Sequence, residues 1–303
     1  MMPLVGCVPN FSDGRDPAIL EAICEALQQH PIWILDVESD ADHNRSVVTF
    51  AGAPEDVADA MLSAAAVAMQ RISLEHHQGV HPRVGVVDVT PFVPLRDLSL
   101  VQCASLARSF AQRAAETLDV PVYLYEAAAL HPERRALPVV RNLGYERLKA
   151  EIGHNLHFAP DFGPSRIGPA GAMMVGARSP LIAFNLYLDT SDVLKAQAIA
   201  SKIRERDGGL PGVRALGLLV GGRAQVSCNL LDSQRTSMAA LVTAVRREAH
   251  KLGAEVVDTE LIGLAPQAAL LAAAAELLGL PPAAAGATIE GRLGALTGDY
   301  RPL

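Results

Sequence analysis

The chain has 303 residues, of which 50% are hydrophobic and 19% are charged, a composition typical of globular proteins that excludes a largely disordered chain. Its length suits about two domains, because a single hydrophobic core stops growing at roughly 250 to 300 residues. A net charge of -7 and a pI near 5.7 exclude the basic footprint of a nucleic-acid-binding protein.

Strand and helix patterns alternate through the first half of the chain. Asp16 is a suitable helix N-cap, and Pro17 suits the first helical position after it. The pattern predicts a strand at 4–8, a helix after Pro17, strands at 32–37 and 46–50, a helix at 54–72 and a strand at 84–89. A helix at 99–118, a strand at 120–127 and a helix at 137–152 are predicted to follow.

The second half repeats the β-α-β-β-α-β order after a loop rich in Gly and Pro. The predicted elements are a strand at 181–188, a helix at 192–206, strands at 213–220 and 224–230, a helix at 237–252 and a strand at 255–261. Two such units predict an α/β (α+β) fold of two ferredoxin-like β-α-β-β-α-β subdomains. We expect a ligand cleft or tunnel between them.

Cysteine spacing and apolar segments bear on the compartment. The four cysteines are widely scattered and form no CxxC pair, so we expect free buried thiols. The N-terminus MMPLVGCVPNF lacks the features of a signal peptide. The most apolar segment, residues 261–280, is interrupted by Pro266 and Glu276, so a buried Ala-rich helix is predicted there. We therefore expect a cytoplasmic enzyme with no membrane or nucleic-acid partner.

Three histidines, His76, His77 and His81, fall within six residues ahead of a predicted strand. His76 and His77 are expected to be solvated residues at the end of the preceding helix, where cationic side chains are favoured. A metal site is an alternative, but Gly79 and Pro82 disfavour a helix that would bring the histidines to one face. His81 lies in a loop next to a strand, and its side chain could titrate near neutrality and transfer protons.

A second polar cluster is the hairpin loop of LDVESDADHNRSVVTF, where Glu38, Asp40 and Asp42 precede Arg45. The spacing lacks the glycine and the final glutamate of an EF-hand calcium loop. Asp40 and Asp42 are expected in a solvated turn. Glu38, at the end of a strand, is better placed to enter a cleft and orient a histidine.

Two further patterns are open to more than one interpretation. The segment PDFGPSRIGPAGA does not match a phosphate-binding loop, so it is either a linker or a rigid loop whose backbone lies against a flat heterocycle. Asn10, Gln225, Ser227 and Asn229 are polar residues at strand ends or alternating along a strand, which a half-exposed strand also shows.

Eight segments, taken in order, resemble the formiminotransferase family, the glutamate formimidoyltransferases, over about residues 3–280. They are VPNFSDGR, LDVESDADHNRSVVTFAG, GVHPRVGVVDVTPFVPL, VPVYLYEAAA, APDFGPS, VGARSPLIAFNLYL, AQVSCNLLD and ELIGLAP. The resemblance implies an N-terminal formiminotransferase subdomain at 1–178, a C-terminal subdomain at 179–303, and a homodimer.

The implied reaction transfers the formimino group from N-formimino-L-glutamate to N5 of tetrahydrofolate, giving 5-formimidoyltetrahydrofolate and L-glutamate, in histidine degradation. Tetrahydrofolate is then a co-substrate, and no metal is expected. Some family members are fused to a cyclodeaminase, for which 303 residues leave no room, so a separate cyclodeaminase is expected downstream.

The resemblance also implies roles for individual residues. The catalytic histidine of the GxHPR motif is His81, and the acidic residue after the LDV strand is Glu38. Arg45, Arg83 and Arg178 are candidates to bind the glutamate carboxylates. The folate-binding loop falls on Gly163, Pro164, Ser165, Arg166, Ile167, Gly168, Pro169, Ala170 and Gly171. Further candidates for substrate binding are Asn10, Asn185, Gln225, Ser227 and Asn229.

Two other functions compete with this transferase. A metal-dependent formiminoglutamate hydrolase would use His76, His77, His81 and Asp88. A non-catalytic folate-binding relative would retain the fold without turnover. The sequence also leaves open whether the donor carries a formimino or a formyl group.

Overall fold

A computed structural model describes residues 2–79, 82–142, 144–281, 287–289 and 292. The chain divides into two compact units, Met1–Ser179 and Pro180–Leu303. Each unit has its own sheet and its own hydrophobic core. The predicted mixed α/β fold is confirmed.

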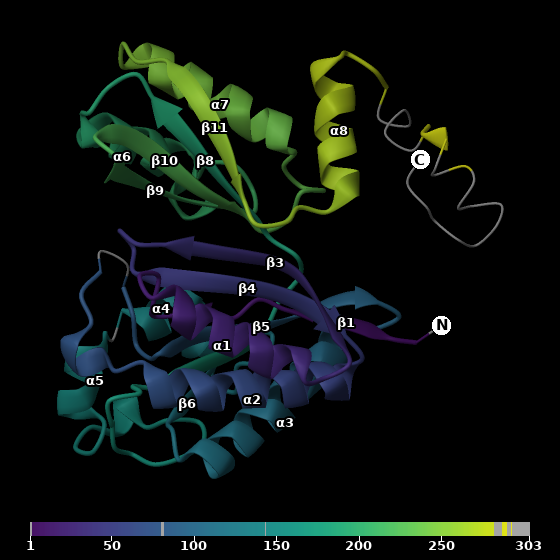
Figure 1. Cartoon of the computed structure of the whole chain (residues 1–303). Coiled ribbons are helices and arrows are strands. Elements are labelled where there is room, and N and C mark those ends of the chain that lie inside the picture. The colour runs from purple at the N-terminus through teal and green to yellow at the C-terminus, as the bar shows by residue number, and fades with distance from the viewer. Residues whose placement is uncertain (1, 80–81, 143, 282–286, 290–291, 293–303) are drawn as a thin grey trace. The chain divides into compact units, whose positions relative to one another are not determined.

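The first unit is built on a seven-stranded sheet (Figure 1). Its strands are β1 (Leu4–Cys7), β2 (Asn10–Phe11), β3 (Ile32–Asp40), β4 (Arg45–Gly52), β5 (Val87–Arg96), β6 (Val122–Glu126) and β7 (Met173–Ala177). Strand β3 pairs with β4, and β1 and β2 both lie between β4 and β5, antiparallel to them. Strand β7 lies between β5 and β6 and is parallel to both.

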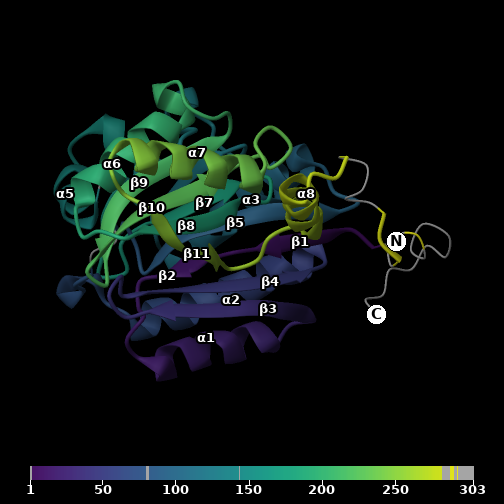
Figure 2. The same cartoon turned by 90° about the horizontal axis from the view of Figure 1, so that it is seen from above.

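Three long helices cover one face of this sheet: α1 (Pro17–Gln28), α2 (Pro54–Arg71) and α3 (Leu100–Leu118). Figure 2 shows α1 beside β3, with α2 next to it. Helix α1 begins as predicted, because the side chain of Asp16 accepts a hydrogen bond from the Ala18 amide. Helix α3 begins with a capping box formed by Ser99 and Gln102.

Shorter helices complete the first unit. They are α4 (Leu137–Arg141), α5 (Tyr145–Glu151), and the 3₁₀ turns η1 (Leu74–His76), η2 (Pro132–Arg134) and η3 (Leu156–Phe158). Val140, Leu148 and Phe158 from α4, α5 and η3 share a separate apolar cluster with Val89 and Met174 of the sheet.

Three details of the first unit differ from the sequence prediction. The helix expected at 137–152 is split into α4 and α5, and Gly144 at the break has a φ of 63°. Strand β5 starts and ends later than the predicted strand and passes through Pro91 and Pro94. Strands β2 and β7 were not predicted, since β2 has only two residues and β7 follows a segment that reads as a loop.

The second unit has the predicted β-α-β-β-α-β order. Its strands are β8 (Ile182–Leu188), β9 (Val213–Val220), β10 (Arg223–Leu230) and β11 (Val256–Ile262), and its helices are α6 (Val193–Ile203), α7 (Met238–Lys251) and α8 (Gln267–Leu277), with the 3₁₀ turn η4 (Glu205–Asp207). The four strands pair in the antiparallel order β11, β8, β10, β9. Burial alternates along β8, and α6 and α7 bury side chains such as Leu186 and Val226 on one face.

The expectation of a buried Ala-rich helix at 261–280 is wrong. Only Ala269 and Ala275 are buried in α8, while Leu270 and Leu277 are 43% and 70% exposed. The helix carries apolar side chains on all of its faces, and packing against α7 covers only one of these faces. In the described part of the chain, no helix is both long enough and apolar enough to cross a membrane.

Candidate active site

Glu38 belongs to a row of residues that crosses the sheet of the first unit. Glu38 on β3 is the Cα partner of Val47 on β4, and Val47 is the partner of Asn10 on β2. Directly paired residues project to the same face of a sheet. Arg45 precedes Val47 by two positions and therefore shares that face. The face is opposite to the one covered by α1, α2 and α3, because the adjacent Val48 packs against those helices.

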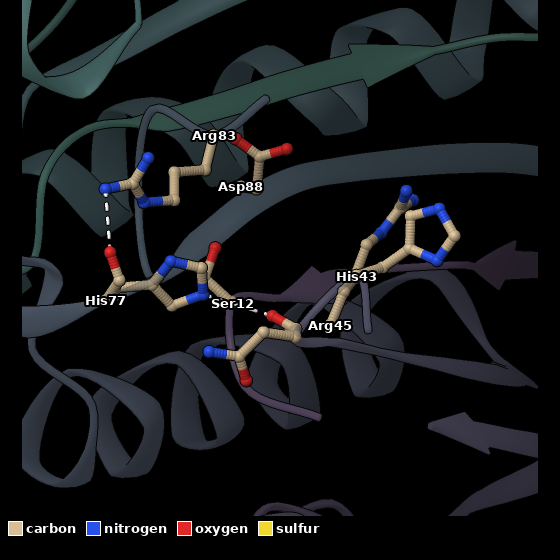
Figure 3. A pocket seen from close by; sticks show the side chains of 7 residues that line it. Ser12, His43, Arg45, His77, Arg83 and Asp88 are labelled. Atoms are coloured by element: carbon tan, nitrogen blue, oxygen red, sulfur yellow. Dashed lines mark hydrogen bonds between the residues drawn. The ribbon is translucent and has the colours of Figure 1, made fainter. Parts of the chain in front are cut away.

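A small pocket opens in the first unit, and it includes Arg45 (Figure 3). Its lining comes from the end of β2, from the hairpin between β3 and β4, and from three residues of the following segment, His77, Arg83 and Asp88. The lining residues are Ser12, His43, Asn44, Arg45, His77, Arg83 and Asp88. Arg45 and Arg83, two of the predicted carboxylate-binding residues, therefore line one pocket.

Asn44 joins the hairpin to two other segments. It is only 6% exposed and adopts a left-handed backbone conformation, with a φ of 50°, which asparagine tolerates better than most residues. Its side-chain oxygen accepts a hydrogen bond from the Gly14 amide at 3.0 Å, and its Nδ2 donates to the carbonyl of Gln78 at 3.0 Å. The turn is thereby fixed against the segment that follows η1.

His77 makes a second connection to the same residue. Its Nε2 lies 3.1 Å from the backbone oxygen of Asn44, and because a carbonyl only accepts, Nε2 carries the proton. Burial lowers the pKa of His77, the hydrogen bond to Asn44 opposes this shift, and the nearby charge of Arg83 adds to it. His76 is exposed as expected, but the same expectation is wrong for His77, which is half-buried and lines the pocket.

Arg83 holds the far side of the same segment. Its Nη2 donates to the carbonyl of His77 at 3.1 Å and to Oε1 of Glu146 at 2.9 Å. The carbonyl of Arg83 accepts from the Tyr145 amide at 3.0 Å. Gly79 passes so close to the hairpin that an added Cβ would lie 2.5 Å from the carbonyl oxygen of His43.

These contacts fix the chain on both sides of position 81. The predicted catalytic residue, His81, itself lies outside the described residues. Residues 77–79 are held against the hairpin between β3 and β4, and Arg83 is bonded to the carbonyl of His77.

Asp88 is the centre of a buried charge cluster. It is 2% exposed, its Oδ1 accepts from the Val84 amide at 2.8 Å, and its Oδ2 accepts from Nη2 of Arg141 at 2.8 Å. The pKa of Arg45 is lowered to about 10, chiefly by burial and also by the charge of Arg141, while the charges of Asp88, Asp40 and Glu38 oppose the shift. Arg45 and Arg141 are thus both within electrostatic reach of Asp88.

The predicted folate-binding loop runs along the segment after position 83. The Val86 amide donates to the carbonyl of Ala170 at 2.9 Å, and the Ala172 amide donates to that of Val84 at 3.0 Å. Gly171 has a φ of 73°, and an added Cβ would lie 2.2 Å from the Val84 carbonyl oxygen. Only glycine accommodates both this conformation and this approach.

The rest of this loop is more open. Ser165, Arg166 and Gly168 are exposed, and nothing lies within 4 Å of a Cβ built on Gly168. Arg166 forms an ion pair with Asp119. The loop thus lies next to residues 84–86 on one side and presents backbone to solvent on the other.

The other substrate candidates in the first unit lie in different surroundings. Asn10 is buried, and its Nδ2 donates to the Val8 carbonyl at 3.1 Å. Arg178 follows β7, its amide donates to the Phe92 carbonyl at 3.1 Å, and its guanidinium donates to the Ser179 carbonyl at 3.2 Å. Neither side chain lines the pocket of Figure 3.

In the second unit the sheet brings the remaining candidates to one face. Ser227 is the partner of Asn185, and Gln225 is the partner of Tyr187, across β10 and β8. Asn229 is two residues beyond Ser227 on the same face. This face is opposite to the one that packs against α6 and α7.

Glu260 organises this polar face. Its Oε2 accepts from Nδ2 of Asn185 at 3.2 Å and from the hydroxyl of Tyr187 at 3.0 Å. The guanidinium of Arg223 lies 4.5 Å from the centre of the Tyr187 ring. Glu260, Tyr187 and Arg223 were not predicted, although all three lie in segments with polar and apolar residues alternating.

The metal alternative involved His76, His77, His81 and Asp88. Among the residues that the structure describes, no three His, Cys, Asp or Glu side chains are grouped closely enough to hold a metal ion. His76 is exposed at the end of η1, whereas Asp88 is buried and bonded to Arg141.

Asn44 and Arg141 are residues of this site to which the sequence-based prediction gave no role, and Asp88 was named only for the metal-dependent alternative. Asp88 had a detectable signal, since a carboxylate within the apolar run VGVVDVT has to be paired if the strand is buried. Arg141 had none, because its partner is 53 residues away in the sequence.

Most of the chain matches models of one known family. Residues 4–178 match the model of the formiminotransferase domain, N-terminal subdomain, and residues 183–278 match that of the formiminotransferase domain.

Individual relatives cover nearly the whole chain. The chain is 42% identical over 275 residues to a glutamate formimidoyltransferase of Thermoplasma acidophilum. The matched region covers 89% of this chain and 90% of the relative. A glutamate formimidoyltransferase of Streptococcus pyogenes is 37% identical, with 89% and 92% covered. The formimidoyltransferase-cyclodeaminase of Rattus norvegicus is 44% identical over 91% of this chain, which spans 52% of that relative. The chain belongs to the formiminotransferase family.

Proposed function

We propose that this protein is a glutamate formimidoyltransferase that moves the formimino group of N-formimino-L-glutamate to N5 of tetrahydrofolate. The products are 5-formimidoyltetrahydrofolate and L-glutamate. Relatives that are 42% and 37% identical over nearly their whole length bear the name glutamate formimidoyltransferase, which supports this activity.

One structural observation carries the assignment of the site. Before position 81, His77 and Gln78 are bonded to Asn44 in the hairpin between β3 and β4, and after it Arg83 is bonded back to the carbonyl of His77. The proposed folate-binding loop is bonded to the same segment through Val84 and Val86. This arrangement supports a site at which the donor and the folate meet near residue 81.

The chemistry needs one group that can both accept and donate a proton. N5 of tetrahydrofolate attacks the formimino carbon. The new carbon–nitrogen bond gives a tetrahedral intermediate. A proton then leaves N5, another reaches the glutamate nitrogen, and the bond between that nitrogen and the formimino carbon breaks. We assign both transfers to His81, since a histidine with a pKa near neutrality suits them and typically contributes about 10²- to 10⁴-fold.

Other residues orient and bind. We assign Glu38 to fixing the tautomer of His81 and stabilising its protonated form. We assign Arg45 and Arg83 to the donor carboxylates, because a guanidinium can bind a carboxylate through two parallel hydrogen bonds. Holding the two substrates together supplies a large further part of the rate.

The second unit contributes a polar surface to this proposal. Asn185, Gln225, Ser227 and Asn229 share one face of its sheet, and we assign them to the polar groups of a substrate. Arg178 remains a candidate for a carboxylate contact.

Several wider properties belong to the same proposal. We propose that residues 1–178 and 179–303 are the two formiminotransferase subdomains, that the protein is a cytoplasmic homodimer, and that a separate cyclodeaminase consumes its product. Tetrahydrofolate is a co-substrate here, and the reaction as written uses no metal.

The test compares wild type with His81→Gln, with and without tetrahydrofolate and with a metal chelator present. Wild type should turn over formiminoglutamate only with folate, and His81→Gln should lose about 10²- to 10⁴-fold in kcat while still binding folate. Turnover without folate would favour a hydrolase. Undiminished turnover by His81→Gln would show that another residue is the base.

A further inference from the structure

The ion pair between Asp88 and Arg141 uses only one nitrogen of the guanidinium group. Asp88 directs its two oxygens to different partners, Oδ1 to the Val84 amide and Oδ2 to Nη2 of Arg141, each at 2.8 Å. The ion pair therefore uses a single hydrogen bond from Nη2 of Arg141, and not two parallel hydrogen bonds. The Nε atom of Arg141 is buried and has no acceptor among the described residues.

Arg141 lies within electrostatic reach of a second guanidinium group. Its charge acts on buried Arg45, whose desolvated cation would gain from an added anion. Arg83 lines the same pocket as Arg45 and Asp88, and its Nε is also buried without an acceptor in the described part of the chain.

Most of the carboxylates around these arginines are exposed or half-buried. Asp40 accepts from Nδ1 of His43 at 2.7 Å and from the amides of Asp42 and His43, and its side chain is 52% exposed. Glu146, the partner of Arg83, is 70% exposed. Glu38 acts on Arg45 from β3, and Asp88 is the buried carboxylate of the group.

We propose that Arg141, held in place by Asp88, forms with Arg45 the binding site for one carboxylate of the glutamate-derived donor. The proposal rests on the function proposed above and names its specificity-determining residue. Asp88 is then a positioning residue that fixes the guanidinium of Arg141, and the Nε–H of Arg141 donates to the donor carboxylate. A carboxylate matches the planar fork of a guanidinium, whereas a carboxamide offers only one acceptor oxygen.

The test pairs Arg141→Met with Arg141→Lys, which retains the charge beside Asp88 but lacks the fork. Arg71→Met, at the exposed end of α2, is the matched control. Kinetics are measured with N-formimino-L-glutamate and with its side-chain amide and α-amide analogues. Titration calorimetry measures the binding of L-glutamate without any need for turnover.

We expect Arg141→Met to raise KM for the donor, and to weaken L-glutamate binding, by about 10- to 100-fold, as expected for a lost charged hydrogen bond. Its kcat and its KM for tetrahydrofolate should be unchanged, and it should lose the wild-type preference for the donor over one amide analogue. Arg141→Lys should fall between wild type and Arg141→Met, and it decides the matter if Arg141→Met does not fold.

Two results separate this inference from the proposed function. If wild type transfers the formimino group but L-glutamate binding and amide discrimination do not depend on Arg141, the inference is overturned and the function stands. If wild type shows no transfer but L-glutamate binding still depends on Arg141, the function fails and the carboxylate site stands.

Discussion

Nε2 of His77 donates a hydrogen bond to the backbone carbonyl of Asn44 at 3.1 Å, joining residues 33 positions apart in the sequence. Asn44 returns a bond from its Nδ2 to the carbonyl of Gln78, the next residue after His77. The hairpin between β3 and β4 and the segment leading to position 81 are therefore locked together by two reciprocal contacts. Substitutions that remove these two hydrogen bonds should loosen the site without removing any residue assigned to catalysis.

Replacing His77 by Gln or by Phe separates the hydrogen bond from the side-chain volume. Gln can place its amide N–H near the position of Nε2, whereas Phe fills the space and leaves the Asn44 carbonyl without this donor. We expect His77→Phe to lower the free energy of unfolding by about 1 kcal/mol and His77→Gln to cost less, as measured by urea denaturation. Equal losses in both variants would mean that the bond to Asn44 contributes nothing.

The same histidine predicts a pH dependence. Folding lowers the pKa of His77, chiefly through burial, so the unfolded chain binds a proton more readily. The stability of wild type relative to His77→Gln should therefore fall as the pH drops below the unfolded value of about 6.5. Urea midpoints measured from neutral to mildly acidic pH check this. A constant difference between the two proteins would show that the pKa of His77 is the same in both states.

Two glycines of the proposed folate-binding loop form a matched pair. Gly171→Ala places a Cβ 2.2 Å from the Val84 carbonyl at a φ of 73°, so we expect a loss of at least about 1 kcal/mol of stability. Gly168→Ala meets nothing within 4 Å and should leave the unfolding midpoint unchanged.

If folate lies against this loop, Gly168→Ala should still raise KM for tetrahydrofolate, because the added methyl group lies on the exposed side. Steady-state kinetics at saturating donor measure this. A normal KM in a normally folded Gly168→Ala protein would remove Gly168 from the folate contact.

Asp88→Asn tests the buried ion pair as a structural unit. Removing one partner leaves Arg141 with a weakened partner in a largely buried position, which typically costs about 3 to 5 kcal/mol. The double variant Asp88→Asn with Arg141→Met should lose less than the sum of the two single variants, because the groups interact directly. Chemical denaturation of all four proteins gives the coupling, and strictly additive losses would contradict it.

The order of elements could be predicted because each strand and helix carries its own local pattern. The alternation of buried and half-buried residues along β8, for example, follows directly from period-two polarity. Strand β7 could not be recognised, because MMVGA shows no alternation and is buried on both faces as a parallel strand between β5 and β6. The prediction that α8 is buried was wrong, because amino-acid composition shows how apolar a helix is but not which residues pack against it.

The site divides in a similar way. Glu38, Arg45 and Arg83 could be proposed because they lie in motifs that resemble a family. The roles of Asn44 and Arg141 depend on partners 34 and 53 residues away, and no local pattern reports such contacts. His77 was misread as solvated because its neighbours in sequence, His76 and Gln78, are exposed while its ring is directed to Asn44.

The most direct measurement follows the formimino carbon itself. N-formimino-L-glutamate labelled with ¹³C at the formimino carbon is incubated with tetrahydrofolate, the protein and a metal chelator, and the label is followed by NMR. The account predicts that the label moves to N5 of the folate as L-glutamate is released. Release of the label into solution without attachment to the folate, or consumption of the donor in the absence of folate, would contradict it.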